Sequence, residues 1–310
     1  MRAVVIHDPQ AEPVCADFPE PAANEQMFSL VGAGLHQVVR SLAAGRHYGS
    51  TAAYPLVPGV DAVARDAAGR LVYTGFITPP WGTMAERMAA RLGIPLPEGV
   101  DPLAVAAGTN PAMSSWLNLR ARAAEAPLGT VLVLGATGQS GRIAVASALA
   151  LGAERVVAVG RDESALAELA SDTVTTVRLG EGAQERLAAA LTPAPSLVLD
   201  YLWGPVAELT FAALERRGLD EDDADITYLQ IGGMAGPTAA LPAALLRSRR
   251  IRIAGSGAGS MSTQQILAEL PSLWQLMAEG KIQVPYQAFP LAEASAAWAY
   301  RGPGRPVLVP

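Results

Sequence analysis

Cysteine and histidine are scarce in this chain of 310 residues, and their scarcity limits its chemistry. Cys15 is the single cysteine, and the three histidines are His7, His36 and His47. One cysteine allows neither an internal disulfide nor a thiolate zinc site. The chain is long enough for one large domain or two ordinary ones.

Long apolar runs, a signal peptide and a positive net charge are absent as well. No window approaches the roughly eighteen uninterrupted apolar residues of a membrane span. The first ten residues, MRAVVIHDPQ, lack the apolar core and cleavage site of a signal peptide. The formal net charge of -6 disfavours a nucleic-acid partner. We therefore expect a soluble cytoplasmic protein with no membrane and no nucleic acid as partner.

Apolar residues and glycine are plentiful instead, and one stretch combines them. Residues 131–141, VLVLGATGQSG, place four apolar residues before Gly135, Gly138 and Gly141. The apolar run predicts a buried parallel strand, and the residues that follow predict a helix. Glycines at such a turn let backbone N–H groups approach a phosphate, which the helix N-terminus attracts. The stretch is typical of a pyrophosphate-binding loop, although a plain strand-to-helix turn can have the same pattern.

Strands and helices alternate from residue 130 onward, as in a doubly wound α/β sheet of six strands. The predicted strands are residues 131–134, 155–159, 174–177, 197–200, 227–231 and 251–254. The predicted helices between them are residues 142–151, 163–170, 184–191, 206–217 and 238–246. Ligands of such sheets bind at the carboxyl ends of the strands, where this sequence repeatedly has glycine. The predicted cofactor-binding residues are Gly135, Thr137, Gly138, Gln139, Ser140, Gly160, Arg161, Tyr201, Gly232, Gly233, Gly255 and Ser256.

The two ends of the chain have a different pattern. Short strand-like runs broken by proline and glycine predict a mostly β domain at the front. The tail predicts a helix over 264–280, started or kinked by Pro271, and then strand, helix and strand. We expect a mostly β domain over 1–117, the six-stranded nucleotide domain over 118–260, and a segment over 261–310 that returns to the first domain.

The second predicted strand bears on the choice between NADPH and NADH. NAD-binding proteins usually carry an acidic residue about twenty residues past the glycines, and Gly160 stands there instead. Arg161 supplies a planar cation that can bind the 2′-phosphate of NADPH, or it is a surface arginine. Asp162 comes one residue late and can cap the helix after it. The sequence favours NADPH as cofactor.

Several segments, in order, resemble the medium-chain dehydrogenase/reductases. Residues 54–61 (YPLVPGVD) and 82–86 (GTMAE) match segments of that family, as do 96–100 (LPEGV) and the end, 305–309 (RPVLV). The resemblance implies a six-stranded Rossmann domain beside a mostly β, GroES-like catalytic domain. The family's cysteine and histidine zinc ligands are missing, so the chain resembles the zinc-free quinone oxidoreductase and enoyl reductase-like branch. No metal is expected.

The resemblance also implies an activity and its residues. It implies hydride transfer from NADPH to a small quinone, enone or enoyl-type carbonyl substrate, in a homodimer. Tyr48 matches a tyrosine near the substrate of enoyl-thioester reductases, or it is a loop residue. His36 contacts substrate or packs in the core. Asn110 binds the nicotinamide carboxamide or caps a helix beginning at Pro111. The alternative function is an NADP(H)-binding redox sensor or accessory protein without turnover.

Overall fold

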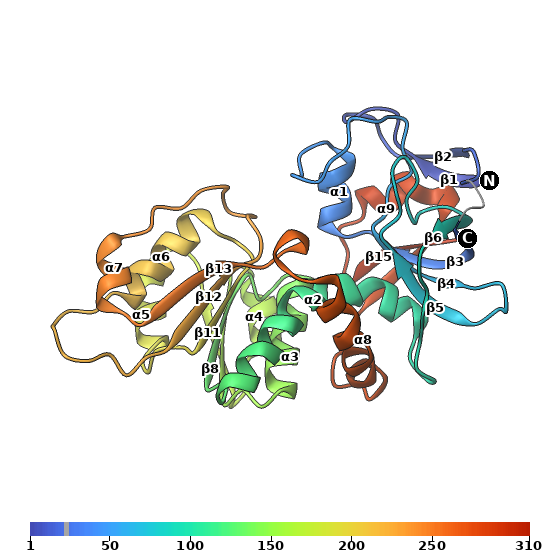
Figure 1. Cartoon of the computed structure of the whole chain (residues 1–310). Helices are drawn as coiled ribbons and strands as arrows, with labels where there is room; N and C mark the ends of the chain where they lie inside the picture. The colour runs from blue at the N-terminus through green and yellow to red at the C-terminus, as the bar shows by residue number, and fades with distance from the viewer. Residues whose placement is uncertain (22–24) are drawn as a thin grey trace. The chain divides into compact units, whose positions relative to one another are not determined.

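The computed structural model describes residues 1–21 and 25–310, which form two compact units (Figure 1). The first unit holds Met1–Pro111 together with Leu270–Pro310, and the second holds Ala112–Glu269. The two ends of the chain therefore build one unit, and the central segment builds the other.

The second unit is built on a parallel sheet of six strands, which confirms the predicted fold class. The strands are β8 (Thr130–Leu134), β9 (Arg155–Gly160), β10 (Val174–Arg178), β11 (Leu197–Asp200), β12 (Ile226–Gln230) and β13 (Ile251–Gly255). Their order is β10-β9-β8-β11-β12-β13, and neighbouring strands are parallel. The order reverses at β8, which is the kind of position where doubly wound sheets bind nucleotides.

Helices cover both faces of this sheet, because both faces are apolar. In β8, Val131 and Val133 belong to one apolar cluster, while Leu132 and Leu134 belong to the cluster on the other face. All four side chains are fully buried. The helices of this unit include α3 (Gln139–Ala150), α4 (Glu163–Leu169), α5 (Ala183–Ala190), α6 (Gly204–Leu214) and α7 (Ala243–Ser248).

The first unit is mostly β, also as predicted. A two-stranded antiparallel sheet joins β1 (Arg2–Val5) and β2 (Val14–Asp17). The larger sheet contains β3 (Gln26–Gly34), β4 (Asp61–Arg65), β5 (Leu71–Gly75), β6 (Arg87–Ala90), β7 (Ile94–Pro95), β14 (Tyr286–Pro290) and β15 (Arg305–Val309). Two short helices, α1 (Gln37–Ala43) and α9 (Ala294–Ala299), belong to the same unit.

The end of the chain is tied into this first sheet. β15 pairs antiparallel with β3, with Val307 opposite Gly34 and Leu308 opposite Ala33. The Arg40 guanidinium in α1 donates a hydrogen bond of 2.7 Å to the carbonyl of Trp298 and lies over its ring. The segment Leu270–Pro310 thus completes a core that Met1–Pro111 begins.

Two of the described helices contain an internal proline, and at each of them one of the two alternatives from the sequence is wrong. The helix predicted to begin at Pro111 is the long α2 (Pro102–Glu125), so Asn110 lies inside it and does not cap it. Its N-terminus is capped instead by Asp101, whose carboxylate accepts hydrogen bonds from the N–H groups of Leu103 and Ala104. Likewise, α8 (Thr263–Ala278) runs through Pro271, which does not start it.

The predicted helix over 238–246 is wrong in its first half. The observed helix, α7, begins at Ala243, directly after Pro242. A proline forces the residue before it into an extended conformation, so a helix cannot run through Leu241 into Pro242 without strain. In the described part of the chain, no helix is both long enough and apolar enough to cross a bilayer.

Candidate functional site

The glycine loop of the second unit is held against the next strand. The N–H groups of Gly135 and Ala136 both donate to the carbonyl of Val159 in β9, each at 2.9 Å. Gly135 has a φ of +91°, which side chains with a Cβ rarely adopt. The loop therefore leaves β8 by a turn that glycine permits, with its path fixed by β9.

Helix α3 begins at the end of this loop and approaches it closely. Gly138 is the N-cap residue of α3 and supplies no side-chain cap. A Cβ at Gly141 would lie 2.2 Å from the Gly135 carbonyl oxygen, so only glycine allows the helix to start here. An uncapped helix N-terminus beside a glycine loop is the arrangement that binds phosphate groups.

Gly160 ends β9 and lies directly beneath Thr137 of the glycine loop. A Cβ at Gly160 would come within 2.6 Å of Thr137 Cγ2. The position that carries an acidic side chain in many NAD-binding proteins is therefore closed here unless the Thr137 side chain moves. This packing gives a physical reason for the missing carboxylate.

Arg161 follows Gly160 and differs from the arginines near it. Arg142 forms an ion pair of 2.8 Å with Glu168, and Arg178 lies 3.5 Å from Glu163. The exposed Arg161 makes no hydrogen bond or ion pair with any residue that the structure describes. Asp162 is the N-cap of α4, as one interpretation of the sequence held, because its carboxylate accepts a 3.0 Å hydrogen bond from the Ala165 N–H. Arg161 thus offers a guanidinium with no competing carboxylate.

The loops after β11 and β12 lie beside each other at the same edge of the sheet. The N–H groups of Ile231 and Gly232 donate to the Asp200 carbonyl, and that of Met234 donates to the Tyr201 carbonyl. A Cβ at Gly135 would meet Tyr201 Cβ at 3.4 Å, so the glycine loop adjoins these loops. Gly232 is half-buried and Gly233 is exposed. The carboxyl edge thus gathers the predicted residues of three loops.

Two side chains at this edge are engaged by other parts of the unit. The Tyr201 hydroxyl lies 3.3 Å from that of Ser114, and burial raises the pKa of the phenol. The Ser256 hydroxyl accepts a hydrogen bond from Asn118 at 2.7 Å and lies 3.2 Å from the Ser114 carbonyl. Gly255, just before it, is exposed, and no atom lies within 4 Å of where its Cβ would be. Because both partners, Asn118 and Ser114, belong to α2, these hydrogen bonds give Ser256 a structural role.

Asp200 at the end of β11 is structural in its contacts. Its carboxylate is fully buried and accepts hydrogen bonds from the N–H groups of Leu202 and Trp203 and, at 2.6 Å, from the Tyr228 hydroxyl. Burial raises the pKa of Asp200, although these hydrogen bonds oppose the shift. The carboxylate fixes the turn that carries Tyr201 toward the glycine loop.

The three predicted catalytic residues belong to the first unit but make no contact with one another. Tyr48 follows α1 with 80% of its surface exposed, and its ring lies 4.0 Å from that of His47. Asn110 is half-buried within α2. No hydrogen bond, ion pair or ring contact joins Tyr48, Asn110 and His36 among the described residues.

His36 is almost fully buried and faces a carboxylate that the sequence analysis missed. Its Nε2 lies 3.1 Å from Oδ1 of Asp61, and the two residues are 2% and 4% exposed. The Tyr73 hydroxyl donates to the other oxygen, Oδ2, at 2.6 Å. Asp61 ends the segment YPLVPGVD and begins β4, whose next three residues are apolar. The signal that could have found it is an acidic residue next to the apolar residues of a predicted strand.

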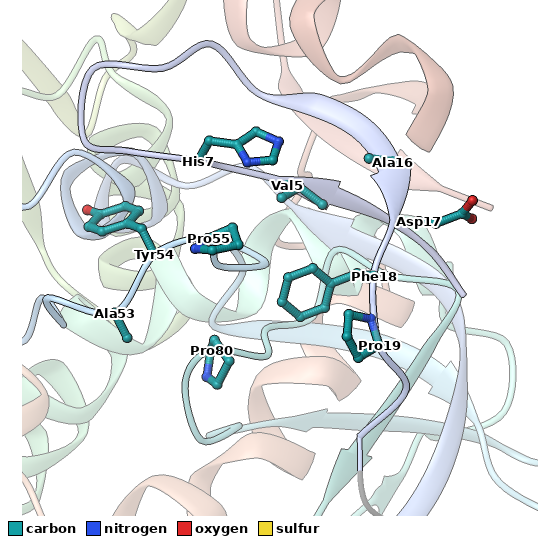
Figure 2. Close-up of a pocket in the computed structure, with 10 residues that line it drawn as sticks. All are labelled: Val5, His7, Ala16, Asp17, Phe18, Pro19, Ala53, Tyr54, Pro55 and Pro80. Atoms are coloured by element: carbon teal, nitrogen blue, oxygen red, sulfur yellow. The ribbon is translucent and has the colours of Figure 1, made fainter.

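A separate groove of the first unit contains none of the predicted catalytic residues (Figure 2). Its volume is about 460 Å³, and the walls are largely apolar, with Phe18, Pro55 and Pro80 among them. The ionisable residues of its lining are His7 and Asp17, which are exposed, and Tyr54, which is half-buried. Among the described residues, no group of three or more His, Cys, Asp or Glu side chains is placed to hold a metal ion.

The second unit fits a dinucleotide by its shape and charge. The tight glycine loop and the uncapped start of α3 leave backbone N–H groups for a pyrophosphate. No carboxylate stands at Gly160, and the exposed Arg161 remains for a further phosphate. A nicotinamide cofactor bound here would supply the hydride, while the protein orients it and its acceptor.

Comparison with known proteins gives one close match in sequence and many in structure. No family model matches the chain. A probable NADPH-dependent quinone reductase of Emericella nidulans, tdiC, is 30% identical, and the alignment covers 92% of each chain. The quinone oxidoreductase of Thermus thermophilus, solved also in complex with NADPH, is 25% identical with a TM-score of 0.79 and full coverage of both chains. A mycobacterial quinone oxidoreductase has a TM-score of 0.81 at 20% identity, again over both whole chains.

The contact between Gly160 and Thr137 generates a prediction. We expect Gly160→Ala to weaken NADPH binding about tenfold or more, roughly 1.4 kcal/mol, because the new methyl group displaces Thr137 and the glycine loop. Nicotinamide fluorescence titration measures the dissociation constant. The double variant Gly160→Ala/Thr137→Ala removes the clashing Cγ2 and should recover part of the affinity. Full affinity in Gly160→Ala alone would show that the loop does not hold the nucleotide.

Proposed function

Because the chain belongs to the quinone oxidoreductase group of the medium-chain dehydrogenase/reductases, we propose that it catalyses NADPH-dependent reduction of a small quinone, enone or enoyl-type carbonyl compound. The observation that carries the proposal is the carboxyl edge of the second unit, where the glycine loop, the closed position at Gly160 and the unpaired Arg161 meet. The name of the 30% identical relative, an NADPH-dependent quinone reductase, supports the same activity.

The second unit is proposed to bind the cofactor along this edge. The start of α3, with Gly138, Gln139 and Ser140, would hold the pyrophosphate, and Gly135 and Thr137 would shape the loop. Arg161 would bind the 2′-phosphate bidentately. Residues of the other loops, Tyr201, Gly232, Gly233, Gly255 and Ser256, would line the remainder of the cofactor.

The first unit is proposed to bind the acceptor. Tyr48 would donate a hydrogen bond or a proton to the carbonyl compound, since an exposed phenol is free to meet a ligand. Asn110 would bond the nicotinamide carboxamide, and His36 would take part in proton transfer. The reaction is proposed to need no zinc, so turnover should persist after treatment with a chelator.

The role of Arg161 leads to a test of cofactor choice. We expect Arg161→Ala to weaken NADPH binding about tenfold or more, about 1.4 kcal/mol, because the 2′-phosphate loses its cation. Binding of NADH, which has no 2′-phosphate, should change little. Fluorescence titration with both nucleotides measures the two effects, and Arg178→Ala, which removes an arginine already near Glu163, is the matched control. Equal losses for NADPH and NADH would contradict a phosphate-specific role.

The role of Tyr48 can be tested by comparing two acceptor classes. An enone needs a proton on carbon after the hydride, whereas a reduced quinone takes its protons from water. Tyr48→Phe should therefore lower kcat for an enone about tenfold or more and leave quinone turnover nearly unchanged. Steady-state kinetics with both substrates decides it. If wild-type protein binds NADPH but reduces neither, a redox sensor or accessory protein replaces the reductase.

A cytoplasmic homodimer is part of the proposal. A single cysteine needs no oxidising compartment, which favours the cytoplasm. β13 is the last strand of its sheet, with Ala254 and Gly255 exposed and Ile251 and Ile253 half-buried. An uncovered edge strand of this kind can pair with the same strand of a second copy. Sedimentation equilibrium should give twice the chain mass, and Ile253→Lys should give the monomer. A monomeric wild type would refute this part.

A further inference from the structure

Buried polar atoms without a hydrogen-bond partner are concentrated at one place in the first unit. Six such side-chain atoms occur among the described residues, and four of them belong to a single cluster: Nδ1 and Nε2 of His36, Oδ1 of Asp61 and Nε of Arg305. Folded proteins leave few buried polar atoms unpaired, and those few call for an explanation. This concentration points to a role other than packing.

The His36 imidazole is held in place without using its nitrogens. His36 is the N-cap residue of α1, yet its side chain makes no capping hydrogen bond. Gly34 leaves room for the ring, since a Cβ there would lie 2.5 Å from His36 Cε1 and 2.7 Å from Nε2. The ring position therefore depends on steric fit and on Asp61.

Asp61 is fixed so that one oxygen remains for His36. The Tyr73 hydroxyl donates to Oδ2, and burial together with the Asp61 charge raises the pKa of Tyr73 well above its ordinary value. Tyr73 therefore stays a donor. The Asp61 backbone carbonyl accepts a hydrogen bond from the Thr83 hydroxyl, which fixes the residue further. Oδ1 is left facing Nε2 at 3.1 Å, within reach but not aligned as a hydrogen bond. Such contacts in ligand-free sites often tighten on binding.

This contact decides where a neutral His36 carries its proton. A bare nitrogen lone pair facing a carboxylate oxygen at 3.1 Å is repelled, whereas an N–H is attracted. On this ground we expect the proton of the neutral ring on Nε2. Nδ1 keeps its lone pair and, in the described part of the protein, has no partner.

The other charges at the cluster are positive. Arg305, whose guanidinium lies 3.5 Å from the Leu35 carbonyl, interacts with Asp61 and with Arg40. Burial, and Arg40 to a smaller extent, lower the pKa of Arg305 to about 10, so it is charged at neutral pH. The ionisable groups around His36 in this cluster are Asp61, Tyr73, Arg305 and Arg40. Asp61 supplies the negative charge of the cluster.

We propose that Asp61, fixed by Tyr73, is a positioning residue that keeps the proton of neutral His36 on Nε2 and leaves Nδ1 as the atom that exchanges a proton with the reaction. The inference rests on the proposed reductase function. A bound nicotinamide cofactor would supply the hydride, Tyr48 would hydrogen-bond the carbonyl oxygen, and protonated His36 would give its Nδ1 proton to the resulting anion. The N–H bond breaks, a C–H or O–H bond forms, and His36 returns to the neutral Nε2–H form. Water restores the Nδ1 proton.

The histidine tautomer can be measured directly. With three histidines in the chain, long-range ¹H–¹⁵N spectra of histidine-labelled protein give one pattern per ring, and His36→Gln assigns His36. Wild-type His36 should show the Nε2–H pattern at a pH where it is neutral. A wild-type Nδ1–H pattern would overturn the proposal without any variant.

Asp61→Asn should invert the tautomer. Tyr73 donates to the carboxamide oxygen, so the NH₂ group faces Nε2, which must then accept, and the proton moves to Nδ1. Adding Tyr73→Phe frees the amide to turn over and should restore the Nε2–H form. Asp66→Asn, which changes an exposed-turn carboxylate just beyond β4, is the matched control and should alter none of the three patterns.

Enzyme kinetics separates positioning from structure. Asp61→Asn should lower kcat for enone reduction about tenfold or more, with the KM for NADPH unchanged, because proton transfer alone is impaired. An inverted tautomer with wild-type kcat would overturn the catalytic role of Asp61, and an unchanged tautomer would overturn its positioning role. If wild-type protein reduces no acceptor, the proposed function fails, while the tautomer spectra still decide how Asp61 holds His36.

Discussion

β8 pairs with β9 on one side and β11 on the other, and all three run in the same direction. This parallel pairing forces the loops that follow them onto one edge of the sheet. Loops some 65 residues apart in sequence, at Gly135 and at Tyr201, therefore come into contact. The candidate cofactor site depends on this pairing, since the loops would not meet at the edge of an antiparallel sheet.

Two buried aspartates show how similar surroundings lead to different roles. Asp200 and Asp61 each accept a 2.6 Å hydrogen bond from a tyrosine, Tyr228 and Tyr73 respectively. The second oxygen of Asp200 is satisfied by two backbone N–H groups, so that carboxylate only fixes a turn. The second oxygen of Asp61 has no such donors and faces His36. Backbone N–H groups lie within hydrogen-bond distance of Asp200 but not of Asp61 Oδ1. Asp200 is therefore structural, whereas Asp61 can act on a titratable neighbour.

Helix boundaries near proline were the least predictable part of the fold. A proline can begin a helix, interrupt it or sit inside it, and the local sequence does not distinguish these outcomes. At Pro242 the helix begins just after the proline, whereas α2 and α8 continue through Pro111 and Pro271. The longer helices tolerate the lost hydrogen bond because their other residues pack against their own units, as Trp116 and Trp274, both almost fully buried, illustrate.

The sequence by itself determined the strand and helix order of the second unit, the glycine loop and the absence of an acidic residue at Gly160. These features are local: apolar runs, glycine spacing and the residue at one strand end express them directly. Tertiary structure decided the rest. Only packing showed that Thr137 closes the Gly160 position and that Arg142 and Arg178 lie near carboxylates while Arg161 remains unpaired. Only the pairing of β4 and β5 brought Tyr73 to Asp61 and left one carboxylate oxygen for His36, because contacts between strands depend on register, which a single sequence does not display.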